Sequence, residues 1–252
     1  GKSKRRQQEA PIVLPVPPRK ECKYSFNAMI PDKHHNKIIA MREHEFYVLN
    51  KNGEESKGPR DVAKRWKHLE DQVEAAYFRN DGYTIFFTRH RYYKYYGVRY
   101  VEGPKLMEDY GLTADLRDMD AAISFPGNGE TYFFKGDKYW KYDEENNVLE
   151  PGYPKLIKLF WRGLPDNLDA ALQTLEGDTY FFKGQNYYKF NHHTFSVFPG
   201  YPKPIGPNWL GCKDKESVID VTIPEGDNNI ALGLRPSYIA IFVAVILWLA
   251  AH

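Results

Sequence analysis

Cysteine is scarce in this chain of 252 residues, and what the sequence lacks excludes several kinds of site. Cys22 and Cys212 are the two cysteines, so there is no Cys-x-x-Cys pair of the kind that binds zinc or performs redox chemistry. A zinc-peptidase helix needs two histidines four residues apart, but after His44-Glu45 the second ligand position holds Val48. Nucleotide-binding loops and a defensible Ser-His-Asp set are also missing. We therefore expect no enzyme within these 252 residues.

An excess of charge of one sign is lacking too. The formal net charge is +2, so nucleic acid is not expected as a partner. Aromatic residues, by contrast, make up 15% of the chain, and such residues favour β-strands. Residues 89–100 interleave basic and aromatic side chains. We expect these to be core tyrosines with exposed basic neighbours, and a protein or glycosaminoglycan contact is their best functional use.

Four internal repeats decide the fold class. Their first residues are spaced by 47, 46 and 49 positions and are Asn27, Glu74, Asp120 and Asp169. The third and fourth repeats share Asp-Ala-Ala, Thr-Tyr-Phe-Phe-Lys-Gly and Pro-Gly-Tyr-Pro-Lys in the same order, at 120–155 and 169–203. Each repeat holds short strands separated by turn residues. Segments 62–66 and 155–160 are apolar at helical spacing, which predicts short outer helices.

A period of this length with several strands per repeat is typical of propeller blades, which must stack around an axis to bury both faces. We therefore predict an all-β fold, a four-bladed β-propeller with short outer helices. Cys22 precedes the first blade and Cys212 follows the fourth, so one disulfide between them would close the ring in an oxidising compartment. Two buried free thiols are the alternative. The predicted organisation is a proline-rich linker at 1–21, blades at about 22–69, 70–115, 116–164 and 165–212, a spacer at 213–237 and an apolar tail at 238–252.

The repeat motifs, with the lead-in Trp161-Arg162-Gly163-Leu164-Pro165 and the ending Trp209-Leu210-Gly211-Cys212, resemble the hemopexin-like repeats of matrix metalloproteinases. The resemblance covers about 22–212, is strong in blades three and four and is weakest in blade one. It implies that the chain is the non-catalytic part of an extracellular zinc endopeptidase, with the zinc and the active site upstream of Gly1. The proline-rich stretch is similar to the hinge between the two domains in that family.

The resemblance also implies a calcium ion in the central channel, held by one backbone carbonyl per blade, at Asn27, Glu74, Asp120 and Asp169. Calcium accepts carbonyl oxygen, so backbone placement matters more than side-chain identity. The alternative is that these side chains only satisfy amides at strand edges. The adjacent pairs His34-His35 and His192-His193 lie in polar turns, and we expect no haem there.

Residues 238–251 are wholly apolar. As a helix they would span about 21 Å, against roughly 30 Å for the hydrocarbon core of a bilayer. A lipid-anchor signal explains the layout better, with residues 230–237 as the spacer and the attachment region at Gly226, Asp227, Asn228 and Asn229. We predict a glycosylphosphatidylinositol anchor, with a short membrane-spanning helix as the alternative. The expected location is the outer face of the plasma membrane or the extracellular matrix.

Two functions follow from these patterns. The first is a recognition domain of a membrane-anchored matrix metalloproteinase, whose partners would be extracellular matrix proteins, protease inhibitor proteins or a second copy in a homodimer. The second is a stand-alone hemopexin-like adhesion or carrier protein without a protease. A His-Glu-x-x-His-x-x-Gly-x-x-His motif upstream of Gly1 would decide for the first.

Overall fold

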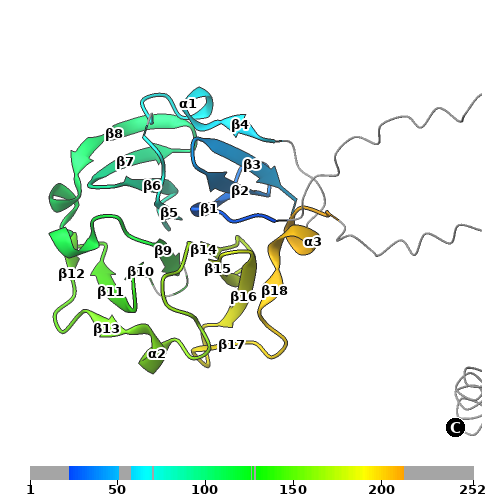
Figure 1. The fold of residues 1–252 in the computed structure, drawn as a ribbon. Coiled ribbons are helices and arrows are strands. Elements are labelled where there is room, and N and C mark those ends of the chain that lie inside the picture. Colours follow the sequence, from blue (N-terminus) through cyan, green and yellow to red (C-terminus); the bar gives the residue numbers. More distant parts are fainter. Residues whose placement is uncertain (1–22, 51–57, 70, 126, 128, 213–252) are drawn as a thin grey trace, which may run out of the picture. The chain divides into compact units, whose positions relative to one another are not determined.

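A computed structural model describes residues 23–50, 58–69, 71–125, 127 and 129–212, all of which belong to one compact unit spanning 1–214. Cys22, the proposed attachment region at 226–229 and the apolar tail lie outside the described residues. The described chain forms four antiparallel sheets arranged as a ring (Figure 1), and the predicted four-bladed propeller is confirmed.

Each repeat makes one blade, and its first four strands are paired in sequence order from the axis outward. In blades 3 and 4 a fifth short strand pairs with the third strand beside the fourth. Blade 1 holds β1 (Ala28–Asp32), β2 (Lys37–Arg42), β3 (Glu45–Leu49) and β4 (Arg60–Asp61), and blade 2 holds β5 (Ala75–Phe78), β6 (Tyr83–Thr88), β7 (Arg91–Tyr96) and β8 (Arg99–Leu106). Blade 3 holds β9 (Ala121–Phe125), β10 (Glu130–Lys135), β11 (Lys138–Asp143), β12 (Val148–Leu149) and β13 (Lys155–Leu156). Blade 4 holds β14 (Ala170–Gln173), β15 (Thr179–Lys183), β16 (Asn186–Asn191), β17 (Ser196–Val197) and β18 (Lys203–Pro204).

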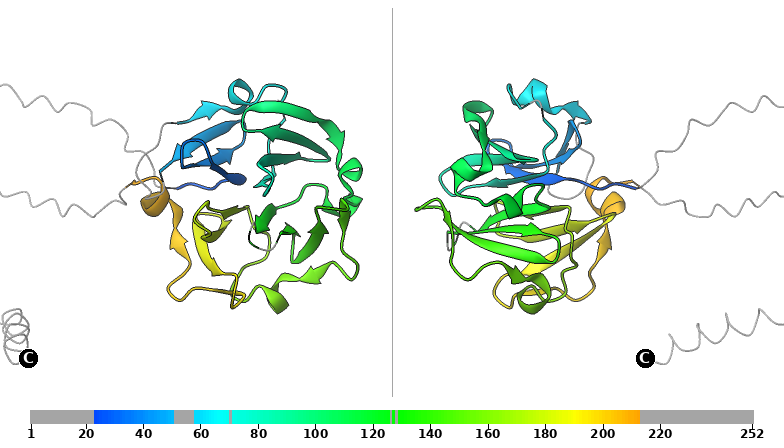
Figure 2. Two further views of the ribbon diagram at one scale, coloured as in Figure 1. Left: turned by 180° about the vertical axis from the view of Figure 1, so that it is seen from behind. Right: turned by 60° about the vertical axis from the view of Figure 1, so that its left-hand side comes forward.

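Short helices follow the outer strands. They are α1 (Val62–Arg65), η1 (Met107–Tyr110), η2 (Ala114–Leu116), α2 (Ile157–Phe160) and α3 (Ile205–Trp209). The helices expected at 62–66 and 155–160 are therefore present, although β13 takes the first two residues of the second segment. The views in Figure 2 show these helices at the periphery of the ring, away from the axis.

The ring closes through its innermost strands. β1 contacts β5 and β14, and β9 contacts the same two strands from the opposite side. Four apolar clusters fill the spaces between neighbouring blades. A large aromatic residue from a short helix or its end lies in each cluster, namely Trp66, Tyr110, Trp161 and Trp209. The core is therefore a set of blade-to-blade interfaces, as expected when single blades cannot bury both faces.

The seam between blade 4 and blade 1 is one of these interfaces. Tyr24 and Phe26 pack there with Trp209, and Cys212 lies partly buried against the same cluster. The position of Cys212 suits a bond that would join the two ends of the ring. Because Cys22 lies outside the described residues, the pairing stays a prediction.

The tyrosines of residues 89–100 divide between the core and the surface. Tyr92, Tyr93 and Tyr95 are buried in the blade interfaces, whereas Tyr96 and Tyr100 are exposed. β8, which forms part of this segment, is eight residues long, while the outermost strands β4, β12 and β17 have two residues each. Blade 2 therefore presents a longer outer edge than the other blades.

Candidate functional site

The axial channel is the first candidate site, and the four predicted calcium positions stand at one end of it. Each position directly precedes an innermost strand. Figure 1 shows these strands, β1, β5, β9 and β14, around the axis of the ring. In every blade the backbone N–H at this position donates to the second strand over 2.8–2.9 Å, and the pairs are Asn27 to Met41, Glu74 to Phe87, Asp120 to Phe134 and Asp169 to Phe182. In each case the accepting residue also faces the next residue of the innermost strand, which is the arrangement of a β-bulge.

The side chains at these positions bind the hairpin turn of their own blade. Asn27 Oδ1 accepts from the Glu43 N–H over 3.0 Å, and Asp120 Oδ2 accepts from the Gly136 N–H over 2.7 Å. Asp169 accepts in the same way from Gly184. These three side chains thus satisfy amides of the hairpin turns.

The backbone carbonyls at the four positions remain candidates for an ion. Outside the strand ladders of the described residues, none of these carbonyl oxygens accepts a backbone hydrogen bond. No group of three or more His, Cys, Asp or Glu side chains that could hold a metal occurs in the described part of the chain. A ring of carbonyls is a donor set that suits a hard cation such as calcium, and it needs no such side-chain cluster.

The electrostatics at this end of the channel also suit a cation. Burial raises the pKa of Glu74, and the nearby charge of Asp118 raises it further. Burial likewise raises the pKa of Asp120, and Asp169 adds to that shift. Lys183 partly offsets the charge of Asp169, with its Nζ 3.0 Å from Oδ1. A bound cation would relieve the remaining repulsion between these carboxylates.

The opposite end of the channel opens into a cavity of about 640 Å³, here called the axial mouth. It is bounded by the ends of the innermost strands, the loops that follow them and the β16–β17 turn. Its lining includes Met29, Pro31, Lys33, Tyr77, Phe78, Asn80, Ala122, Ile123, Ser124, Phe125, Glu130, Ala171, Gln173, Thr174, Leu175, His192, His193 and Phe195. Sequence reasoning missed this cavity because its walls come from all four repeats and are brought together only when the ring closes.

The histidine pairs occupy different surroundings. The ring of His35 contacts Asp32, with Nδ1 3.0 Å from Oδ2, in the turn after β1. The rings of His192 and His193 lie 4.0 Å apart beside the axial mouth. Burial lowers the pKa of His192, and the neighbouring His193 lowers it further, which favours a neutral imidazole at pH 7.

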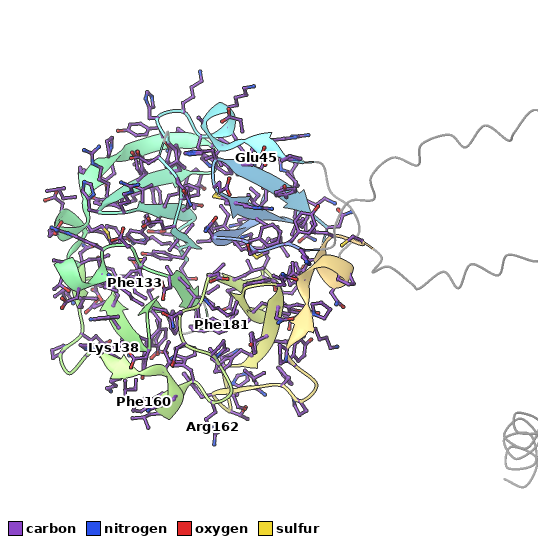
Figure 3. All side chains as sticks on the ribbon, viewed as in Figure 1. Glu45, Phe133, Lys138, Phe160, Arg162 and Phe181 are labelled. Atoms are coloured by element: carbon purple, nitrogen blue, oxygen red, sulfur yellow. The ribbon has the colours of Figure 1, made fainter. Side chains whose placement is uncertain are left out.

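A second hollow, of about 470 Å³, lies on the outer side of blade 3 and is here called the rim groove. Its walls are Tyr132, Tyr139, Tyr153, Leu159 and Phe160, with Glu130, Lys141, Lys155, Arg162 and Phe195 around them. The Lys155 ammonium lies 4.4 Å from the centre of the Tyr153 ring and 5.3 Å from that of Phe160. Figure 3 places Phe160 and Arg162 at the periphery, whereas Phe133 and Phe181 lie inside the blades.

The rim groove departs from the repeat in one informative way. Leu159 is 64% exposed and Phe160 is 44% exposed, although both are large apolar side chains. At the equivalent positions blade 4 has Pro207 and Asn208. The fold therefore does not need apolar residues at these positions, and exposed apolar clusters of this kind often mark contact sites.

Comparison with known proteins agrees with this geometry. Residues 119–166 and 168–212 match a family model described as Hemopexin. Blades 3 and 4 are hemopexin repeats. The two matched ranges correspond to the blades with the clearest repeat motifs.

Curated relatives of this hemopexin-repeat propeller are matrix metalloproteinases. The chain is 33% identical to human matrix metalloproteinase-25 over 161 residues, which is 62% of this chain and 28% of that protein. It is 34% identical to human neutrophil collagenase over 110 residues, or 43% of this chain and 23% of the collagenase. The chain thus spans about a quarter of the length of the relatives it matches.

Solved structures show the same fold. A plant albumin from Cicer arietinum that shows hemagglutination superposes with a TM-score of 0.65 at 19% identity over 74% of this chain and 96% of the albumin. The hemopexin fold protein CP4 from cow pea superposes with a TM-score of 0.64 at 17% identity, covering 73% and 95%. At such identities the likeness shows the fold alone.

Proposed function

We propose that this propeller is the non-catalytic recognition domain of an extracellular zinc endopeptidase that acts on matrix proteins. The observation that carries the proposal is the match to matrix metalloproteinase-25 at 33% identity over 161 residues. Its role would be to hold a macromolecular substrate or an inhibitor protein near the active site. The rim groove, with its exposed Leu159 and Phe160, is the surface best suited to such a contact.

The test uses the full-length protein that carries this chain, expressed with Leu159→Ser and Phe160→Ser together. Both side chains are exposed, so the propeller should fold normally. Cleavage of a folded matrix protein should fall about tenfold, which corresponds to about 1.4 kcal/mol of lost docking energy. Cleavage of a short peptide, which reaches the active site alone, should not change. The control is Val148→Ser, an equally exposed apolar residue outside the groove.

Two results would contradict the proposal. One is an equal fall in the cleavage of peptide and matrix protein, because docking would then not be the affected step. The other is a full-length sequence without the zinc-binding helix motif, which would favour a stand-alone adhesion or carrier protein. In that case the rim groove variants should still weaken binding to an immobilised matrix protein.

Calcium in the axial channel is part of this proposal. The carbonyls of Asn27, Glu74, Asp120 and Asp169 would hold the ion, and its charge would offset the buried carboxylates there. Removing calcium with a chelator should lower the melting temperature of the propeller, and calcium at a hundred times its Kd should restore about 2.7 kcal/mol. Scanning calorimetry with and without calcium measures this. Equal stabilisation by magnesium, which rarely accepts an all-protein cage, would argue against the carbonyl ring.

The location proposed for the protein is the outer face of the plasma membrane, through a lipid anchor added at 226–229, or the extracellular matrix. The support for the anchor is the apolar run at 238–251 behind a polar spacer. Among the described residues, no helix is long and apolar enough to cross a bilayer. A mature protein whose C-terminal peptide still contains Trp248 would contradict a lipid anchor. The Cys22–Cys212 disulfide is proposed with it, since both need an oxidising route to the cell surface.

A further inference from the structure

The axial mouth has the dimensions and lining of a small-molecule site. Its volume of about 640 Å³ falls within the range of roughly 300–1,000 Å³ that is usual for such sites. Apolar side chains from three of the innermost strands form much of its lining, among them Met29, Phe78, Ile123 and Phe125. Leu175, in the loop after β14, extends this apolar wall to the surface and is 42% exposed. An aliphatic chain would be shielded from water there.

The charges at the axial mouth favour an anion. Its lining includes one basic residue, Lys33, and one acidic residue, Glu130. Glu130 is already engaged, because Lys141 Nζ lies 3.0 Å from its Oε1 and the Tyr132 hydroxyl donates to its Oε2 over 2.9 Å. Lys33 is exposed and forms no ion pair with any described residue. The ammonium of Lys33 is therefore available to a carboxylate.

Gln173 adds a requirement for a hydrogen-bond donor. Its Nε2 donates to the Gly177 carbonyl over 2.9 Å, which orients the side-chain amide. Its Oε1 is shielded from solvent, yet it accepts no hydrogen bond from any described residue. Leaving a buried acceptor unpaired is unfavourable. A ligand N–H or O–H in the axial mouth would satisfy this oxygen once the Gln173 side chain turns toward the cavity that it lines.

From these three features we infer that the axial mouth binds a small amphipathic acid with an aliphatic chain, an amide N–H and a carboxylate. The chain would lie against Ile123, Phe125 and Leu175, the amide would donate to Gln173 Oε1, and the carboxylate would contact Lys33. An N-acyl amino acid has this chemistry. The axial mouth shares Glu130 and Phe195 with the rim groove proposed for macromolecular docking, but Lys33, Gln173 and Leu175 line the axial mouth and not the groove. Neither inference depends on the other.

The test is isothermal titration calorimetry of the full 252-residue chain with N-dodecanoylglycine, below the critical micelle concentration of the probe. We expect one site per chain. Dodecanoate, which lacks the amide, and N-dodecanoylglycine methyl ester, which lacks the charge, should each bind about tenfold more weakly. Equal binding of acid and ester would overturn the inference, because the aliphatic chain alone would then be recognised.

Substitutions of single residues test whether N-dodecanoylglycine binds in the axial mouth. Lys33→Glu and Leu175→Asp change exposed side chains of the axial mouth and should each weaken N-dodecanoylglycine binding by about tenfold or more. Lys138→Glu and Val148→Asp are matched changes of exposed residues outside the cavity, and they should leave binding unchanged. Adsorption to the apolar tail would be the same in all four variants, and that result would overturn the inference. Unchanged cleavage of a folded matrix protein by the Lys33→Glu full-length protein is also expected, since docking uses the rim groove.

Discussion

Replacing Trp161 with alanine is expected to lower the free energy of unfolding by about 4–5 kcal/mol, at the upper end for buried aromatic residues. The Trp161 side chain is fully buried between blades 3 and 4. Seven aromatic rings lie with their centres 5.0–6.4 Å from its own, and they come from Phe125, Tyr132, Phe134, Tyr139, Phe181, Phe190 and Phe195. The cavity left by alanine cannot collapse easily, because its walls belong to two sheets that other contacts hold apart.

Chemical denaturation of the variant and the parent chain measures this loss. Leu159→Ala is the matched control from the same outer segment, since Leu159 is 64% exposed and its loss should change stability by less than about 0.5 kcal/mol. A loss below about 2 kcal/mol for Trp161→Ala would show that blades 3 and 4 do not depend on this interface.

The indole nitrogen of Trp161 leads to a further prediction about substitution by phenylalanine. Trp161 Nε1 is buried and has no hydrogen-bond partner among the described residues, whereas Trp66 Nε1 donates to the Gly97 carbonyl over 3.0 Å. Phenylalanine should therefore be tolerated better at position 161 than at position 66, where the substitution also leaves a carbonyl unpaired. If phenylalanine were tolerated better at position 66 than at position 161, ring size alone would determine the stability of both interfaces.

Repeat periodicity predicts the fold because each blade reuses the same local signals. Three signals recur at nearly constant spacing, namely the Asp-Ala-Ala start, the paired aromatic strands and the turn before the third strand. The structure predicted for one blade therefore applies to each of the others. Blade 1 also follows this register, although Asn27 replaces the aspartate and Glu43 replaces the turn glycine. The Glu43 N–H donates to the Asn27 side chain in blade 1, just as the Gly136 N–H donates to the Asp120 side chain in blade 3. This shared turn hydrogen bond explains why the weak motif of blade 1 still makes a regular blade.

The candidate sites depend on contacts that periodicity does not contain. The axial mouth joins at least three residues from each repeat, including those of the β16–β17 turn. The rim groove is distinguished by two residues that break the repeat. Leu159 and Phe160 were visible as a departure from blade 4, so comparing repeats for exposed differences could have found the rim groove. No comparable signal marks Lys33 or Gln173, because their proximity follows from ring closure.

Blade 2 also departs from the repeat, and there a partly buried polar network accompanies Tyr110. Arg79 Nη1 lies 2.6 Å from Glu144 Oε2, and the Tyr77 hydroxyl donates to Glu144 Oε1 over 2.7 Å. The Thr131 hydroxyl donates to the same oxygen over 2.8 Å, and the hydroxyls of Tyr77 and Tyr110 lie 2.7 Å apart. Glu144 of blade 3 is thus held by Arg79 and Tyr77 of blade 2, so the network joins the two blades.

The protonation states in this network are well defined. Burial raises the pKa of Tyr77, and Tyr110 and Glu144 raise it further, so the phenol stays neutral and donates. Burial alone would lower the pKa of Arg79, but Tyr110 and Glu144 outweigh it and the pKa is raised. Glu144 therefore accepts from a charged guanidinium and from neutral hydroxyls, which together occupy both of its oxygens.

Glu144→Ala is expected to lower the free energy of unfolding by about 1–3 kcal/mol, because the Tyr77 and Thr131 hydroxyls lose their acceptor. The partly buried Arg79 loses one carboxylate partner and keeps Asp81, 3.0 Å from its Nη2. Arg79→Ala should have a similar effect, because it removes the cation that faces Glu144. The double variant should lose clearly less than the sum of the two, since removing both charges leaves neither one uncompensated. Glu145→Ala, an exposed neighbour, is the control and should change stability by less than about 0.5 kcal/mol. Additive losses in the double-mutant cycle would show that Arg79 and Glu144 act independently, and the joint between blades 2 and 3 would then rest on apolar packing alone.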